Sequence, residues 1–483
     1  MMWKVFAFSA TVALAACGGA SSLSAESPSL LPHTGSPSSP IQHVVIVIQE
    51  NRSFDNLFDC FTGTACVKRG KEEVKEGSKY VDKWVKLQEQ DLVPKTKNND
   101  IGHCYYSFFT AYDGGKLDGF NLEPQGACPR TWGGSGALTG TFPYQYINPT
   151  EIAPYWDMAQ QYGLADRMFQ TQGSGSFTAH QDLIRGGTIV DANGSSMIDT
   201  PDGEPWGCDA LNPDTKTNLI TTALKWELDK GPFPCTNKFQ VGSSSYETLR
   251  DLLDGAGVSW HYYSPCYSGS PTGGSCHDDS NTNTGALLNA FDVIDSVRYG
   301  KEWGTNVSMP QTNIFTDITN NQLAAVSWVI PLQNDSDHPG DTADNGPSWV
   351  ASIVNAIGQS TYWDSSAVIV VWDDWGGMYD HVPPPGKRDA QGGPGFRVPM
   401  IVVSPYVPQA EVSHTTYFFG SILQYIEGNW NLGSLGTTDA TSTSILNMFD
   451  YQQQPRPFTT IPSDRSIDFF KHEPPSSVPA DPE

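Results

Sequence analysis

The stretch HVVIVIQENRSFD, residues 43–55, sets the expected fold of this chain. An apolar, β-branched run at residues 43–48 leads directly into Gln49, Glu50 and Asn51. Continuous apolar runs of this length are typical of strands that are buried on both faces, as in a parallel sheet. The stretch therefore predicts a central strand whose carboxyl end carries polar side chains capable of chemistry.

Three later stretches repeat this pattern of a short apolar run followed by polar residues. They are 324–330 before Asp335, Ser336, Asp337 and His338; 367–372 before Asp373 and Asp374; and 398–403 before Ser404, with His414 further on. Residues 348–357 have helical spacing. The alternation predicts an α/β fold, a mostly parallel central sheet sandwiched by helices. Ligands of such sheets bind beyond the carboxyl ends of the strands, where these polar residues are expected.

The N-terminus resembles a bacterial lipoprotein signal. Lys4 precedes a brief apolar run, and Leu-Ala-Ala-Cys17 closes it, which would make Cys17 the lipidated first mature residue. The alternative is an ordinary cleaved signal with an incidental cysteine. We expect a signal peptide at 1–16, a flexible tether at 17–40, a catalytic domain at 41–454 and a Pro-rich tail at 455–483. The expected location is the cell envelope of a bacterium, at the outer membrane or in the periplasm.

Charge and cysteine content agree with export. The net charge of −25 makes nucleic acid an unfavourable partner, because phosphate backbones require basic surfaces. Eight of the nine cysteines follow Cys17, and an even number in an exported chain predicts disulfides. Proximity in sequence favours the pairs Cys60–Cys66, Cys266–Cys276, Cys104–Cys128 and Cys208–Cys235. The sequence contains no Cys-x-x-Cys spacing, and a zinc–thiolate cluster is therefore disfavoured.

Three regions are predicted to be insertions between the core elements. Residues 68–99 are rich in lysine and glutamate, which predicts a solvated surface segment. Residues 191–242 and 264–285 are rich in Gly, Ser, Asn and Cys. We expect the latter two to be disulfide-tied loops, a kind of segment that often covers an active site.

Glu50, Asn51, Asp373 and Asp374 are the candidate metal ligands. Adjacent carboxylates repel each other unless a cation or water relieves them. Their oxygen ligands suit Mg²⁺, Ca²⁺ or Mn²⁺ better than they suit Zn²⁺, although the sequence leaves the identity of the divalent metal open. The alternative is that these residues form a turn with a helix cap and a solvated acidic turn.

Ser176 is the candidate nucleophile. Flexible Gly173 and Gly175 precede a helix-like run that starts near Phe177, which places Ser176 at a helix N-terminus that favours an anion. A serine in this position would be activated by losing its proton to a metal-bound or basic group. The alternative is that Ser176 only caps the helix.

The ten histidines offer candidate proton carriers. His103 and His338 lie near segments that carry candidate catalytic residues, whereas His381 follows Tyr379 and Asp380. Any one of them alone is more often structural than catalytic.

Six stretches in this order resemble the bacterial phospholipase C and acid phosphatase group of phosphoesterases, within the alkaline-phosphatase-like superfamily. They span most of residues 41–430 and are QENRSFDNLF (49–58), GKLDGF (115–120), SFTAHQ (176–181), SDHP (336–339), DWGGMYDH (374–381) and RVPMIVVSPY (397–406).

The resemblance implies a set of roles. The metal ligands would be Glu50, Asn51, Ser176, Asp373 and Asp374, with Ser176 also the nucleophile that forms a phosphoseryl intermediate. His103 and His338 would hold the phosphoryl oxygens or act as general acid, and His180 would help to bind substrate. Two features depart from the family. Ser174-Gly175 stands where many relatives have Gly-Pro, and little follows Trp430, where the longer phospholipases carry an extra β domain.

The expected activity is metal-dependent hydrolysis of phosphate esters. Ser176 resembles the acid phosphatase branch, whereas threonine at this point marks many of the phospholipases. Monoesters are therefore expected to react better than phosphatidylcholine, and phospholipase C activity is the alternative. A sulfatase is disfavoured because the run from Ser176 lacks the Cys/Ser-x-Pro-x-Arg pattern. A third alternative is a surface lipoprotein that binds a ligand without turning it over.

Overall fold

A computed structural model of the chain describes residues 37–93, 100–126, 137–190, 196–201, 207–209, 217–221, 226–227, 235, 246–265, 289–340, 343–386 and 393–474. Cys17, the expected signal peptide and most of the expected tether lie outside these residues. Among the described residues, no helix has both the length and the apolar character needed to cross a bilayer.

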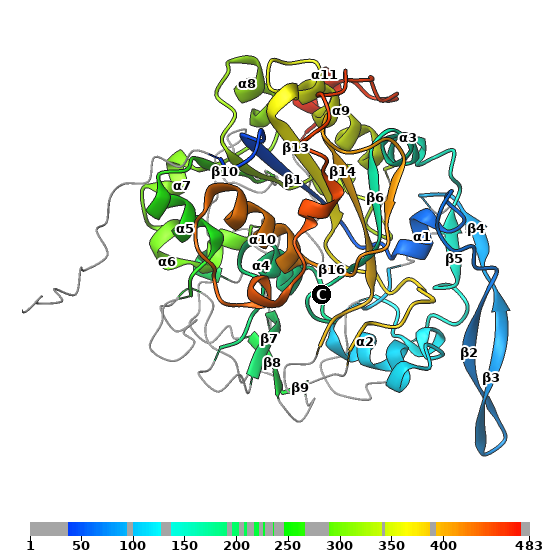
Figure 1. Cartoon of the computed structure of the whole chain (residues 1–483). Coiled ribbons are helices and arrows are strands. Elements are labelled where there is room, and N and C mark those ends of the chain that lie inside the picture. The colour runs from blue at the N-terminus through cyan, green and yellow to red at the C-terminus, as the bar shows by residue number, and fades with distance from the viewer. Residues whose placement is uncertain are drawn as a thin grey trace, which may run out of the picture.

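A nine-stranded sheet runs through the centre of the molecule (Figure 1). Its path is β11-β10-β12-β1-β13-β14-β6-β15, and β16 pairs with β6. The strands are β1 (His43–Gln49), β6 (Gly163–Phe169), β10 (Trp260–Tyr263), β11 (Val307–Ser308), β12 (Val326–Val329), β13 (Ser366–Trp372), β14 (Arg397–Val403), β15 (Glu411–Ser413) and β16 (Tyr417–Phe418). The four apolar runs of the sequence are strands β1, β12, β13 and β14, and every residue of β13 and β14 is buried.

The sheet is mostly parallel, with one reversed strand. β12, β1 and β13 run parallel, and β10 continues the same direction beyond β12. β14 is antiparallel to both of its neighbours, β13 and β6. The expectation that Ser404 lies with the other chemical residues is therefore wrong, because the carboxyl end of β14 is at the opposite edge. The amino end of β14, at Arg397, lies at the edge where β1 and β13 end.

Two tryptophans show that helices cover both faces of the sheet. Ile46 of β1 lies opposite Trp328 of β12 and Ile369 of β13, so these three residues share one face. Trp328 donates its ring N–H to the Leu183 carbonyl of α4 (Ser176–Arg185) at 3.2 Å. Trp372 is three residues beyond Ile369 and faces the other way, where it packs on Tyr155 of α3 (Ala153–Gln161). The predicted three-layer sandwich is confirmed.

The remaining helices extend these two layers. α3 packs with α9 (Gly346–Gly358), which also contacts α8 (Asn313–Thr319) and α11 (Ile467–His472). α4 packs with α5 (Leu249–Ala256) and α10 (Phe419–Trp430). The predicted helix at 348–357 corresponds to α9. Of the expected tail, residues 455–474 run over the surface, and Phe470 packs on Trp349 of α9.

Smaller elements lie outside the main sheet. The predicted surface segment contains a projecting hairpin of β2 (Arg69–Glu76) and β3 (Lys79–Lys86) (Figure 1). The other elements are α1 (Phe54–Phe58), α2 (Tyr105–Tyr112), α6 (Asp295–Arg298), α7 (Glu302–Thr305), β4 (Gln88–Gln90), β5 (Gln145–Ile147), β7 (Ser196–Pro201), β8 (Thr217–Thr221) and β9 (Trp226–Glu227).

Disulfides tie the peripheral segments. The predicted pairs Cys60–Cys66 and Cys208–Cys235 are confirmed. Cys104 is also disulfide-bonded. Its predicted partner Cys128 lies outside the described residues, as do Cys266 and Cys276, so these two pairs stay predictions.

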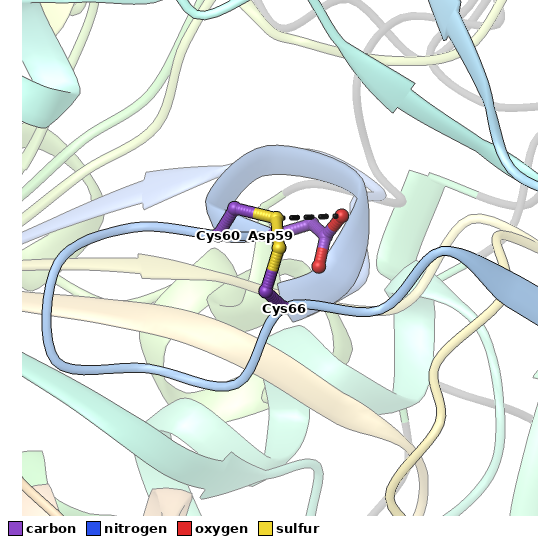
Figure 2. Close-up of side chains that lie close together, drawn as sticks. All are labelled: Asp59, Cys60 and Cys66. Carbon is purple, nitrogen blue, oxygen red and sulfur yellow. Dashed lines mark hydrogen bonds between the residues drawn. A yellow bond between two sulfur atoms is a disulfide. The ribbon is translucent and has the colours of Figure 1, made fainter.

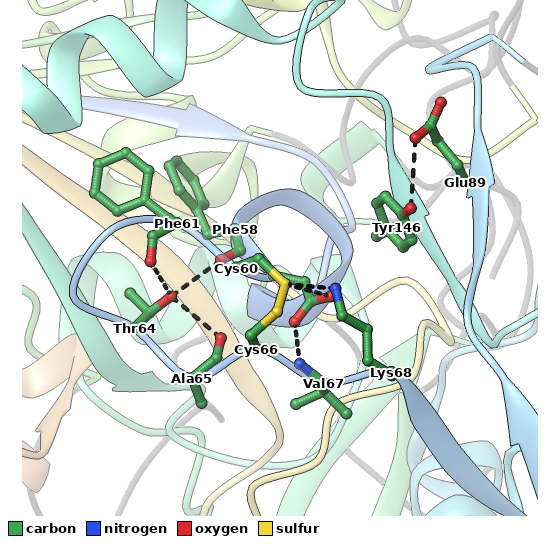
Figure 3. The surroundings of a disulfide bond; sticks show 11 residues. Phe58, Cys60, Phe61, Thr64, Ala65, Cys66, Val67, Lys68, Glu89 and Tyr146 are labelled. Atoms are coloured by element: carbon green, nitrogen blue, oxygen red, sulfur yellow. Dashed lines mark hydrogen bonds between the residues drawn. A yellow bond between two sulfur atoms is a disulfide. The ribbon is translucent and has the colours of Figure 1, made fainter.

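The Cys60–Cys66 loop places a carboxylate next to sulfur (Figure 2). Asp59 Oδ2 lies 3.5 Å from Cys60 Sγ, and Asp59 Oδ1 accepts the Val67 N–H at 2.6 Å (Figure 3). The Lys68 ammonium group lies 3.1 Å from the same sulfur. Because both sulfurs are bonded to each other, the group offers no thiolate to a metal. It closes the loop from which the hairpin starts.

Candidate active site

The carboxyl ends of β1 and β13 bring four candidate ligands together. The strands are parallel neighbours in register from His43 to Gln49, so the residues that follow them emerge side by side. The Asn51 N–H donates to Asp373 Oδ1 at 3.0 Å, across the two strand ends. Glu50 and Asp374 are also buried. The structure therefore gathers the predicted carboxylates and amide into one buried group.

Backbone turns hold this group in place. Asn51 has φ +53° and Gly376 has φ +58°, and a Cβ on Gly376 would lie only 2.0 Å from the Asn51 carbonyl oxygen. Gly376 donates its N–H to Asp374 Oδ1 at 2.6 Å. A side chain at position 376 would force the two turns apart, because even a methyl group overlaps the neighbouring backbone.

Ser176 is the first residue of α4 and points at this group. Gly175, rather than Ser176, occupies the N-cap position. Ser176 Oγ lies 3.2 Å from Asp374 Oδ2 and 3.4 Å from Asn51 Oδ1. The preceding loop is tightly packed, because a Cβ on Gly173 would lie 2.3 Å from the Phe108 ring. The candidate nucleophile thus sits beside the carboxylates and at the N-terminal end of a ten-residue helix.

His180 lies one helical turn beyond Ser176 and belongs to the same group. Its Nε2 is 3.2 Å from Glu50 Oε1 and 3.7 Å from Asp373 Oδ2. Ligand atoms of Glu50, His180 and Asp373 lie within 4.8 Å of one another. The family resemblance implied that His180 helps to bind substrate. The geometry makes its Nε2 a candidate metal ligand as well. The i, i+4 spacing from Ser176 on one helix is the signal that could have placed it here.

His103 contacts the Asn51 and Asp374 part of this group, and His338 lies next to His103. His103 Nε2 lies 2.7 Å from Asn51 Nδ2 and 3.6 Å from Asp374 Oδ2. The His103 and His338 rings are 5.9 Å apart. Nδ1 of each ring lies within 2.7 Å of a backbone carbonyl, of Ile101 and Pro339 respectively. A carbonyl can only accept, so each Nδ1 carries a proton and Nε2 is the atom that can gain or lose one.

The charge balance fits a bound cation. Burial, followed by the neighbouring Glu50 charge, raises the pKa of Asp373 to about 7, against the opposing effect of His180. Asp373 Oδ2 is buried and makes no hydrogen bond with the described residues. Three carboxylates, an amide, a hydroxyl and an imidazole converge on a small volume, a donor set that suits a divalent metal ion. The residues present therefore fit the metal that the sequence predicts.

A second buried acidic cluster lies near the first but is neutralised by protein groups. Arg397, at the start of β14, bonds Asp55 Oδ1 at 2.8 Å and Asp380 Oδ1 at 2.9 Å. His381 Nδ1 lies 2.7 Å from Asp55 Oδ2. Burial opposes protonation of His381, but the bond to Asp55 and the charge of that carboxylate raise its pKa overall. This cluster joins α1 to the loop after β13, and a structural role accounts for it.

Asp337 is a supporting residue whose role the sequence left open. Its Oδ2 accepts the Tyr155 hydroxyl at 2.8 Å and the Trp372 ring N–H at 3.0 Å. Burial raises its pKa to about 6, against the opposing charge of Arg52. These bonds fasten the segment that carries His338 to both the sheet and α3. No local sequence signal identifies this contact, because its partners are far apart along the chain.

Metal affinity is expected to fall as the pH is lowered through about 7. A cation requires ionised Asp373, and below its pKa of about 7 in the metal-free protein, protons compete for the same oxygens. The dissociation constant of Mn²⁺, measured by equilibrium dialysis, should rise by up to about tenfold per pH unit between pH 7 and 5.5 and level off above pH 8. In Asp373→Asn, binding should be weaker and its pH dependence shallower. A flat wild-type profile would contradict this assignment.

The chain is similar to known proteins over most of its length. A model of the phosphoesterase family matches residues 41–433. Phospholipase C B of Mycobacterium tuberculosis is 26% identical, over 86% of this chain and 79% of the relative. Non-hemolytic phospholipase C of Burkholderia pseudomallei is 24% identical, over 81% of this chain and 55% of the relative. Non-specific phospholipase C3 of Arabidopsis thaliana is 24% identical, over 79% of this chain and 66% of the relative.

Solved structures align at much lower identity. A crystal structure of a protein in the alkaline phosphatase superfamily from Vibrio parahaemolyticus covers 86% of this chain and 74% of its own, at 12% identity and a TM-score of 0.33. The family model covers the strand ends, Ser176 and the histidines described above. The chain therefore belongs to the phosphoesterase family and is a hydrolase of phosphoester bonds.

Proposed function

We propose that the chain hydrolyses phosphate esters through Ser176 as nucleophile, in a site that depends on a divalent metal. The observation that carries the proposal is the position of Ser176 Oγ, 3.2 Å from Asp374 Oδ2 at the start of α4. A serine hydroxyl is a weak nucleophile until a neighbouring group takes its proton. Asp374 is placed to do so.

The reaction follows from this arrangement. Ser176 Oγ attacks phosphorus, its proton passes to Asp374 Oδ2, and the bond from phosphorus to the leaving alcohol breaks as the new O–P bond forms. The protonated Nε2 of His338 gives its proton to the departing oxygen, whereas His103 Nε2 accepts from Asn51 Nδ2. The N–H groups at the start of α4 face the charge that develops on the phosphoryl oxygens. Water then attacks the phosphoseryl ester and gives a proton to the neutral His338 Nε2, the bond from phosphorus to Ser176 Oγ breaks, and Ser176 regains its proton from Asp374.

The residues that would hold the metal are Glu50, Asn51, Ser176, Asp373 and Asp374, with His180 within reach. When bound, the cation supplies positive charge that stabilises the phosphoryl oxygens and favours the serine alkoxide. The oxygen ligands favour Mg²⁺, Ca²⁺ or Mn²⁺, and the His180 nitrogen makes Zn²⁺ a further candidate. The residues keep the carboxylates buried, so their charges act at low dielectric.

We propose a phospholipid headgroup ester as the substrate class, cleaved at the glycerol side as in a phospholipase C. Support comes from the relatives named above, which are named as phospholipases C from bacteria and a plant. A phosphomonoesterase of the acid phosphatase type is the second candidate. The serine at position 176 favours the phosphomonoesterase, because many phospholipases of the group that the sequence resembles have threonine at this position.

Substrate comparison decides between the two candidates. For a phospholipase C, kcat/KM on p-nitrophenylphosphorylcholine and phosphatidylcholine vesicles should exceed that on p-nitrophenyl phosphate by at least about tenfold, or about 1.4 kcal/mol in transition-state stabilisation. The reverse preference would establish the monoesterase. A metal-loaded, folded protein that hydrolyses none of the three would instead favour a surface protein that only binds its ligand.

A further inference from the structure

The β2–β3 hairpin projects from the body of the molecule (Figure 1). It comprises residues 69–86 and contains six Lys or Arg and four Asp or Glu residues. This local excess of two positive charges stands in a chain whose net charge is −25. The hairpin is thus a basic element on an acidic protein.

The register divides the hairpin into two unlike faces. Lys71 lies opposite Trp84, and Lys75 lies opposite Tyr80. Since alternate residues of a strand share a face, one face carries these two aromatic residues with four basic and two acidic side chains. That aromatic face comprises Arg69, Lys71, Glu73, Lys75, Tyr80, Asp82, Trp84 and Lys86. The other face has two acidic and two basic side chains, and on it Lys83 and Glu76 form an ion pair at 2.7 Å.

The aromatic face points away from the protein. Gly70, on the other face, is buried, and a Cβ there would lie 2.7 Å from the Tyr144 ring and 2.8 Å from the Tyr379 ring. Val85, opposite Gly70, packs on the same aromatic cluster. Because these residues face the body, their neighbours on the opposite face are directed to solvent.

Two large aromatic side chains are exposed on that face. Trp84 is 65% exposed and Tyr80 is 56% exposed. The ammonium groups of Lys71 and Lys75 lie 5.8 Å and 5.9 Å from these rings. The aromatic pair therefore contributes little to the core, whereas Trp and Tyr beside lysine suit a membrane interface, where rings enter the headgroup layer and ammonium groups meet lipid phosphates.

The root of the hairpin is fastened to the part of the molecule that carries the candidate active site. Asn121 bonds the Glu73 backbone through both of its side-chain groups, at 2.9 and 3.2 Å. Tyr379, against which Gly70 packs, follows Asp374 by five residues. Docking of the hairpin would consequently hold the catalytic domain in a defined orientation.

We propose that the aromatic face of the β2–β3 hairpin docks on the anionic phospholipid surface of a bilayer. The choice of a bilayer over another acidic surface rests on the proposed phospholipid substrate, because an enzyme acting on such a lipid must reach the headgroup layer. The positive face complements anionic headgroups, and Tyr80 and Trp84 enter the interface between them.

Vesicle flotation tests the proposal. The chain is produced from Gly18, so that neither the apolar N-terminal run nor an acyl chain contributes, and its thermal unfolding is checked. On vesicles of phosphatidylcholine and phosphatidylglycerol at 70:30, Tyr80→Ser/Trp84→Ser should weaken partitioning at least tenfold. Lys71→Gln/Lys75→Gln should weaken it at low salt. The control Leu446→Ser/Phe469→Ser removes two exposed apolar side chains elsewhere and should leave it unchanged.

The outcomes separate docking from catalysis. Hydrolysis of soluble p-nitrophenylphosphorylcholine should be the same in wild type and both hairpin variants, because this substrate does not require a membrane. If wild type does not hydrolyse it, the result counts against the proposed function and not against the docking proposal. Equal vesicle binding by wild type and the aromatic variant overturns the docking proposal. It is also overturned if wild type fails to bind anionic vesicles, or if light scattering shows that the substitutions dissociate a dimer without affecting vesicle binding.

Discussion

Ser176→Ala is expected to lower kcat at least about a hundredfold while the protein stays folded. The substitution removes the only protein atom that the proposed reaction bonds to phosphorus, and the residual rate would come from water acting in the remaining site. Little change in the unfolding temperature is expected, because the methyl group fits where the hydroxymethyl group was. Steady-state kinetics and differential scanning calorimetry measure the two quantities.

Ser174→Ala is the matched control for that substitution. Ser174 lies in the loop that leads into α4 and is also buried, but its hydroxyl bonds Thr178 and Asp199 rather than Asp374. We expect less than about a tenfold loss from it. Acid quenching of wild type with substrate labelled at phosphorus should trap a covalent phosphoester of Ser176 that is missing from Ser176→Ala: phosphoserine from a monoester, or a serine diester that keeps the headgroup from a phospholipid. Comparable turnover by Ser176→Ala and wild type would assign the attack to another residue or to water.

Asp374→Ala and Glu50→Ala are each expected to abolish measurable hydrolysis, as is removal of metal by a chelator. Charge stabilisation at a metal site supplies several kcal/mol of the barrier reduction, which corresponds to about a thousandfold or more in rate. Elemental analysis after gel filtration should show that both variants lose most of the bound metal. Adding back a divalent ion should restore wild type but neither variant.

Asp55→Asn distinguishes a metal ligand from a buried structural carboxylate. Asp55 is as deeply buried as Asp374, but Arg397 and His381 hold it. The charge of Arg397, followed by the bond to His381, lowers its pKa despite the opposing effect of burial. The substitution should lower the unfolding temperature and leave the metal content unchanged. Full activity in metal-stripped wild type would show that hydrolysis needs no metal.

Much of the site could be predicted from short stretches of sequence. Glu50, Asn51, Asp373 and Asp374 directly follow apolar runs, and strands β1 and β13 form where these runs predict them. Ser176 follows two glycines at the start of a helix-like run, and α4 begins at that residue. These predictions succeed because each depends on local pattern and on the rule that parallel strands end at the same edge.

Other features depend on contacts between distant residues. The apolar run at 398–403 predicts a strand but not its direction, and pairing alone makes β14 antiparallel. His180 contacts Glu50, which is 130 positions away, and no local pattern predicts this contact. Its expected role in binding substrate stays a prediction. The hairpin at 69–86 was expected only as solvated surface, because its charged sequence lacks a simple apolar alternation.

The sequence by itself determined the α/β class, the strands that end at the candidate site and the residue types available there for the proposed metal binding and nucleophilic attack. The tertiary structure decided which of them meet: Ser176 with Asp374, His180 with Glu50, and Arg397 with Asp55. The physical reason is that propensity and periodicity act within a few turns or one strand. Strand direction is instead set by how strands distant in sequence pair, and the contacts of buried charges are set by which distant groups the folded core brings together.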